Sequence, residues 1–261
     1  FDLSRGPALR VVVLRVPGDC RRRLIFTAHH ILMDGWALGV FFTEMLAVYR
    51  AGGSVDGLLP PRPYRDYIAW LARQDRVAAL SRWNAYLCGV SAPLMVADGT
   101  VAPRDGVPGS AERVLPAADT ARLRNWAGRN GLTLNTAVLF AWAVVLSRLT
   151  DRRDVVFGTV VSGRPEHLPG VEGMVGLFIN TVPVVHSFVA TDTVAGHCAR
   201  LQREASAMRD IGYLSLSEIQ RAHGRGALFD SLFVFENAPV EDAIREVTTP
   251  DGARFRPVEM E

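Results

Sequence analysis

Lysine is missing from the chain: all 29 of its basic residues are arginine, against 27 acidic residues, which gives a formal net charge of +2. Arginine keeps its charge and carries no nucleophilic amine, and the codon usage of a GC-rich genome is the simplest reason for the imbalance. The only tight basic cluster is Arg21–Arg23, next to the turn-like segment Pro17–Asp19. A nucleic-acid-binding face requires a larger basic patch than this one.

Cysteine is scarce, since Cys20, Cys88 and Cys198 are odd in number, far apart and without CxxC spacing. Such a set supports neither a disulfide framework nor a zinc ribbon, and it favours a reducing compartment, so we expect a cytoplasmic location. The HExxH, GxSxG and GxxxxGK[ST] patterns are also missing. The sequence therefore predicts no metal site, no serine-hydrolase elbow and no phosphate-binding loop.

Long hydrophobic runs are missing as well. The longest apolar segments, such as Val11–Leu14 and Thr136–Ser147, fall short of the roughly 20 residues that a membrane-spanning helix needs. The first residues, Phe1–Arg5, show no signal-peptide pattern and resemble mid-domain sequence. With 261 residues, 49% of them hydrophobic, the chain is long enough to bury a core in one large domain or two modest ones.

The hydrophobic pattern predicts a mixture of strands and helices. Residues 8–16 and 23–30 are apolar segments on either side of a turn, which predicts a β-hairpin. Apolar residues recur every three or four positions after Gly35, which predicts a helix that ends at Gly52-Gly53. The same patterns predict helices over 64–73, 75–87, 119–129 (with Asp119 as N-cap), 136–149 and 193–208, strands over 111–115, 155–161, 181–185 and 231–236, and a linker or long loop over 93–109. This order of elements indicates an α/β or α+β layered fold.

The densest group of reactive side chains is the segment His29–Gly35, where the second strand meets the following helix. A histidine in such a place can act as a general base, because its ordinary pKa of about 6.5 is close to working pH. Alternation along the strand predicts opposite faces for His29 and His30. Asp34 can fix the geometry of the histidine or cap the helix, and the residues alone leave both interpretations open.

Four ordered motifs resemble those of the condensation domains of nonribosomal peptide synthetases. Ala28–Ala37 contains the HHxxxDG motif, and Tyr64–Trp70 resembles YxDxAxW. Val175–Thr181 resembles VGxFVNT, and Arg225–Asn237 contains a segment similar to LFDxxFxxEN. The motifs that precede HHxxxDG in this family are not found, so we expect an N-terminally truncated domain.

The resemblance implies a chloramphenicol acetyltransferase-like fold of two lobes with a tunnel between them. Most of the N-terminal lobe would be missing, with residues 1–92 forming its end and residues 93–261 forming the C-terminal lobe. It also implies that the α-amine of an acceptor aminoacyl thioester attacks a donor thioester to form a peptide bond. Both substrates would be carried on phosphopantetheine arms of upstream and downstream peptidyl carrier proteins, next to an adenylation domain. No cofactor, nucleic acid or membrane is expected to bind this domain.

The resemblance assigns the catalytic set to His30, Asp34 and Gly35. His30 would accept a proton from the attacking amine or hydrogen-bond to it, and the Gly35 N–H would face the developing oxyanion. Asp34 would orient the loop by pairing with an arginine, which we expect in the missing segment. Residues expected to play structural or supporting roles are His29, Asp66 and Asn180.

Three other functions remain possible at this point. An epimerisation domain also carries HHxxxDG, although the late LFDSLFVFEN segment favours condensation. Cyclisation domains carry paired aspartates in place of the two histidines and are disfavoured. A non-catalytic recruitment domain could keep the fold, although intact His30, Asp34 and Gly35 argue against it.

Overall fold

A computed structural model describes residues 1–15, 18, 22–97, 109–224, 226–236, 247–248 and 254–255. The chain divides into two compact units. Unit 1 holds residues 1–74, residues 164–179 and the described residues from Glu236 on, and unit 2 holds residues 75–163 and 180–235. The expected boundary after residue 92 lies within unit 2, because the chain leaves unit 1 at Gln74.

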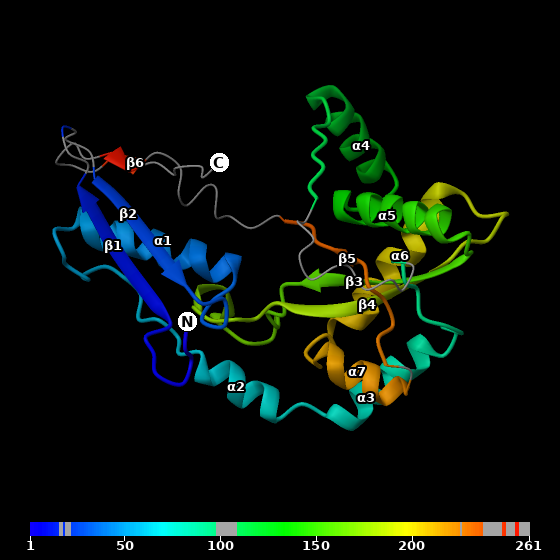
Figure 1. Ribbon diagram of the computed structural model, residues 1–261, viewed down its shortest axis with the longest axis horizontal. Coiled ribbons are helices and arrows are strands. Elements are labelled where there is room, and N and C mark those ends of the chain that lie inside the picture. The colour runs from blue at the N-terminus through cyan, green and yellow to red at the C-terminus, as the bar shows by residue number, and fades with distance from the viewer. Residues whose placement is uncertain are drawn as a thin grey trace. The chain divides into compact units, whose positions relative to one another are not determined.

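Unit 1 is built on the expected hairpin, in which β1 (Leu9–Arg15) and β2 (Arg22–Ala28) pair antiparallel with Leu9 opposite Ala28. Helix α1 (Gly35–Arg50) lies along this hairpin (Figure 1), and Phe26 of β2 packs against Phe41 and Phe42 of α1. Strand β2 ends at Ala28, so His29 and His30 lie beyond it. The prediction that alternation along the strand separates the two histidines was therefore wrong. The turn expected over residues 17–19 lies largely outside the described residues.

A second apolar cluster of unit 1 forms around helix α2 (Arg65–Ala72). Its side chains come from α2 and from the segment 164–179, which includes the short helix η1 (Val171–Gly173). The buried members are Tyr67, Leu168, Val171, Met174 and Phe178. The segment 164–179 therefore packs with unit 1, although it joins two strands of unit 2. Two further short strands, β6 (Val247–Thr248) and β7 (Arg254–Phe255), pair antiparallel.

Unit 2 combines a sheet of order β4-β3-β5 with five helices among its described residues. Strand β3 pairs antiparallel with β4 and parallel with β5. The elements are α3 (Arg76–Leu87), α4 (Ala117–Arg129), α5 (Leu134–Thr150), β3 (Asp154–Val161), β4 (Asn180–Ser187), α6 (Val194–Arg209), α7 (Leu216–His223) and β5 (Leu232–Phe233). Trp83 is fully buried in the core, where its indole N–H donates to the Ile211 carbonyl at 3.0 Å.

Several sequence predictions for unit 2 were wrong in detail. Residues 111–115 form no strand, and the strand expected over 231–236 is limited to Leu232–Phe233. Asp119 lies in the first turn of α4, whose N-cap is Pro116. Within the expected linker over 93–109, residues 98–108 are not described, while Leu94 forms a β-bridge with Phe229.

Helix α7 was missed altogether, although its start carries a recognisable signal. Ser215 caps the helix and Glu218 completes a capping box, the pattern S-x-x-E. Across the described residues no single helix is long and apolar enough to cross a membrane. Helices α4 and α5 pass that test only as a pair, and a bend of 104° separates them.

Candidate active site

Asp34 begins helix α1 as its N-cap. Its backbone is extended, with φ of −92° and ψ of 179°, and its Oδ1 accepts a hydrogen bond from the Ala37 N–H at 2.8 Å. A carboxylate suits this place, because the first turn of a helix presents unpaired N–H groups and a partial positive charge. Asp34 is only 2% exposed, so the cap is shielded from water.

Asp34 also binds the segment that leads into β4. Its backbone N–H donates to the Gly176 carbonyl at 3.2 Å. Its Oδ2 accepts from the Phe178 N–H at 2.9 Å. Both carboxylate oxygens are therefore engaged by backbone donors within unit 1.

Arg164 completes the environment of Asp34. Its Nη2 lies 3.4 Å from Asp34 Oδ1, and its Nη1 donates to the carbonyls of Val171 and Met174. The guanidinium carbon stands 3.9 Å from the centre of the Phe178 ring, within the range of a cation–π interaction. Burial lowers the pKa of Arg164, while the charge of Asp34 raises it. The expected arginine partner of Asp34 is thus present in this chain, and the expectation that it lies in a preceding segment was wrong.

The two histidines occupy a turn between β2 and α1. The Leu32 N–H donates to the His29 carbonyl at 3.0 Å, and the Ile31 N–H donates to His29 Nδ1 at 3.1 Å. The His29 ring also meets the Phe1 ring edge-on, with ring centres 6.0 Å apart. His29 therefore braces the turn.

His30 and Gly35 are exposed and differ in this respect from Asp34. Within the part of the chain that the structure describes, neither the His30 ring nor the Gly35 N–H has a hydrogen-bond partner. Both groups are therefore available to a substrate. The turn held by His29 and the cap formed by Asp34 fix the backbone on either side of them.

Tyr64, just before α2, holds the segment that binds Asp34. Its hydroxyl donates to the Leu177 carbonyl at 2.5 Å, and its ring meets the Phe178 ring edge-on with centres 5.1 Å apart. A Cβ on Gly176 would lie 2.1 Å from Cδ2 of Tyr64, so only glycine fits beneath this ring. Burial and the nearby Asp34 charge raise the pKa of Tyr64, which keeps its hydroxyl protonated.

Asp66 lies apart from the Asp34 cluster. Its Oδ2 pairs with Nε of Arg62 at 2.9 Å, in a partly exposed pair spaced four residues apart on the chain. Arg62 in turn donates to the Pro169 carbonyl. Asp66 therefore has a supporting contact with the segment 164–179.

Asn180 belongs to unit 2 and is fully engaged there. Its Nδ2 donates to the carbonyls of Gly212 and Leu214 at 2.7 and 2.6 Å, and its Oδ1 accepts from the Thr181 N–H at 2.9 Å. These bonds join the start of β4 to the turn after α6.

The sequence analysis missed Arg164, and it assigned no contacts to Tyr64 and Gly176. Tyr64 and Gly176 lie in the quoted motifs, but no pattern in the sequence pointed to Arg164. Within the described residues, no group of three or more His, Cys, Asp or Glu side chains could hold a metal ion.

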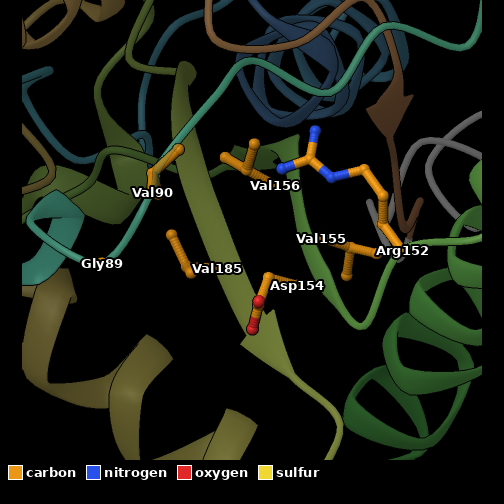
Figure 2. A pocket seen from close by; sticks show the side chains of 7 residues that line it. All are labelled: Gly89, Val90, Arg152, Asp154, Val155, Val156 and Val185. Atoms are coloured by element: carbon orange, nitrogen blue, oxygen red, sulfur yellow. The ribbon is translucent and has the colours of Figure 1, made fainter.

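Unit 2 contains one small hollow that proves unsuitable for a ligand (Figure 2). It is lined by Gly89, Val90, Arg152, Asp154, Val155, Val156 and Val185, and its volume is about 10 Å³. That volume is at the limit for a single water molecule. The Arg152 guanidinium is already bound to the carbonyls of Pro93 and Ala92, at 2.7 and 3.2 Å. We therefore assign the hollow to imperfect packing.

Comparison with known protein families identifies this arrangement. Residues 1–261 match the family model of the condensation domain, and the chain belongs to this family. A linear gramicidin synthase of Brevibacillus parabrevis is 40% identical over 260 residues, which make up 95% of this chain and 3% of that protein. Surfactin synthase subunit 3 of Bacillus subtilis (strain 168) is 35% identical over 255 residues, 97% of this chain and 20% of that protein. The chain thus spans a small part of these relatives.

Solved structures confirm the expected fold. The EpoB NRPS cyclization-docking bidomain from Sorangium cellulosum matches with a TM-score of 0.73 and 23% identity, over 90% of this chain and 49% of that chain. The first condensation domain of the CDA synthetase matches with a TM-score of 0.66 and 20% identity, over 87% of this chain and 51% of that chain. Identities this low establish only the shared chloramphenicol acetyltransferase-like fold.

Proposed function

We propose that this chain takes part in forming a peptide bond between two carrier-bound thioesters, as a condensation domain of a nonribosomal peptide synthetase. The carrying observation is the difference between His30 and Asp34. The Asp34 carboxylate is buried and engages backbone N–H groups and Arg164 with its two oxygens, whereas the His30 ring is exposed and free for substrate. Asp34 is therefore the positioning residue, and His30 is the group that meets the amine.

The reaction requires an acceptor amine that can attack. An α-amine has a pKa of about 7.7–8.0, so much of it is protonated at neutral pH. Its nitrogen forms a bond to the donor carbonyl carbon, the C–S bond of the donor thioester breaks, and the released thiol takes up the proton that the amine loses. His30 accepts that proton or holds the nitrogen by a hydrogen bond, a contribution of roughly 10²–10⁴-fold.

Gly35 supplies the second element of the mechanism. Its N–H stands at the start of α1, where helix N–H groups lack partners within the helix and favour negative charge. A donor in this place can stabilise the oxyanion of the tetrahedral intermediate. The substrates reach the site on phosphopantetheine arms of two carrier proteins in the cytoplasm, and the domain needs no cofactor of its own.

The test uses the protein that carries this chain, mixed with a donor-loaded and an acceptor-loaded carrier protein. Mass spectrometry of the acceptor carrier should show a new amide, and His30→Ala should lower its rate by roughly 10²-fold or more. His167→Ala removes an exposed histidine of the segment 164–179 and should leave the rate unchanged. Near-normal turnover by His30→Ala would overturn the assignment.

The same assay separates the other functions. An inverted α-carbon without a new amide would indicate epimerisation. A complex with a partner enzyme and no chemical change would indicate a recruitment domain. Either result would contradict the proposed peptide-bond formation.

A further inference from the structure

The three residues 176–178 present their backbone to two different partners. Gly176 and Phe178 bind Asp34 through a carbonyl and an N–H, at 3.2 and 2.9 Å. In an extended chain the backbone groups of alternate residues point to the same side, and those of the residue between them point to the other. The carbonyl of the middle residue, Leu177, is bound by the Tyr64 hydroxyl.

Tyr64 holds this segment by shape as well as by its hydroxyl. Its ring occupies the space where a Cβ of residue 176 would lie, 2.1 Å from its Cδ2. It also meets Phe178 edge-on, a favoured geometry for aromatic pairs, with centres 5.1 Å apart. Phe178 is in turn covered by the Arg164 guanidinium on its face. The segment is thus fixed between Tyr64 and the pair formed by Asp34 and Arg164.

We infer that Tyr64 is a positioning residue of the reaction, acting through the backbone of residues 176–178 on Asp34 and through Asp34 on the turn that carries His30. This inference rests on the proposed function. Loss of the hydroxyl leaves the Leu177 carbonyl without its partner and loosens the two bonds that Asp34 makes to the flanking residues. The reacting groups are then less well aligned, while the carrier-binding surface is untouched.

The first experiment compares two substitutions that each remove one phenol hydroxyl. Tyr64→Phe keeps the ring and should lower kcat by roughly 3- to 10-fold, the value of one hydrogen bond, with KM for the loaded carriers unchanged. The matched control is Tyr86→Phe in unit 2, where the hydroxyl accepts from the Val185 N–H at 2.9 Å. Tyr86→Phe should lower thermal stability and leave kcat unchanged.

The second experiment is a double-mutant cycle with Asp34→Asn. Groups that act along one line of contacts are not additive, so Tyr64→Phe should cause no further loss of kcat in the Asp34→Asn background. Independent, multiplicative losses would overturn the inference, as would an unchanged kcat for Tyr64→Phe alone. A wild-type protein that forms no amide would instead contradict the proposed function.

Discussion

Asp34 and Arg164 form a buried ion pair between residues 130 positions apart, with 3.4 Å between Oδ1 and Nη2. Their side chains are 1% and 5% exposed. The pair joins the turn that carries the histidines to the segment between β3 and β4. Removing one partner of such a pair leaves an uncompensated buried charge.

We expect Asp34→Asn to lower the free energy of unfolding by about 3–5 kcal/mol and to reduce amide formation. The asparagine carries no charge for Arg164, and its amide group cannot accept from both N–H donors. Urea unfolding measures the first effect and the carrier assay measures the second. Asp66→Asn is the control, because its partly exposed pair with Arg62 contributes less than about 1 kcal/mol. An inactive Asp34→Asn protein as stable as the parent would show that the carboxylate takes part in the chemistry.

We expect Gly176→Ala to be destabilising by about 1–3 kcal/mol, since the new Cβ would lie 2.1 Å from the Tyr64 ring. The control is Gly128→Ala in α4, where nothing lies within 4 Å of the added atom. There alanine should stabilise the protein by about 0.4–1 kcal/mol, because it restricts the unfolded chain. Thermal unfolding of the two variants checks both signs. Equal stability of the two variants would contradict the close approach of Tyr64.

His186 should make unit 2 sensitive to acid. It is 1% exposed, and its Nε2 lies 3.1 Å from Nδ1 of His197. Burial, aided by the charge of Arg200 and by His197, lowers the pKa of His186 to about 4, although Asp192 opposes the shift. The unfolded chain binds this proton near its ordinary pKa of about 6.5. Stability should therefore fall as the pH drops from about 6.5 to about 4, by up to about 1.4 kcal/mol per pH unit.

The measurement for His186 is urea unfolding at several pH values in that window. His186→Gln keeps an N–H that can donate to His197 and removes the titrating group, so its stability should depend less on pH. An identical pH dependence in the two proteins would exclude His186 as the cause.

We expect Asn180→Ala to lower the free energy of unfolding by about 1–3 kcal/mol, because the carbonyls of Gly212 and Leu214 lose their donor. Chemical denaturation of the variant checks this value. A loss of amide formation without a loss of stability would show instead that Asn180 acts on substrate.

Local patterns were sufficient to predict most of the elements. The hairpin was correct because the strands alternate with a turn between them, and α5 and β3 were correct because their apolar residues follow the period of a helix or fill a buried strand. Residues 111–115 failed because no neighbouring strand pairs with them among the described residues. Strand β5 is short because only Leu232 and Phe233 pair with β3.

For the site, the sequence determined which residues stand at the turn. The histidine motif follows a strand and precedes a helix, so its two ends are fixed by local structure, and Asp34 is a helix cap by its position alone. The four ordered motifs also determined the family.

Only the tertiary structure decided what each motif residue contacts. Arg164 lies 130 positions from Asp34, and Gly176 lies more than a hundred positions from Tyr64, so no periodicity along the chain relates them. These contacts depend on the packing of the segment 164–179 against α1 and α2. That packing requires a glycine beneath an aromatic ring and an arginine beside a buried carboxylate, and it separates a buried Asp34 from an exposed His30.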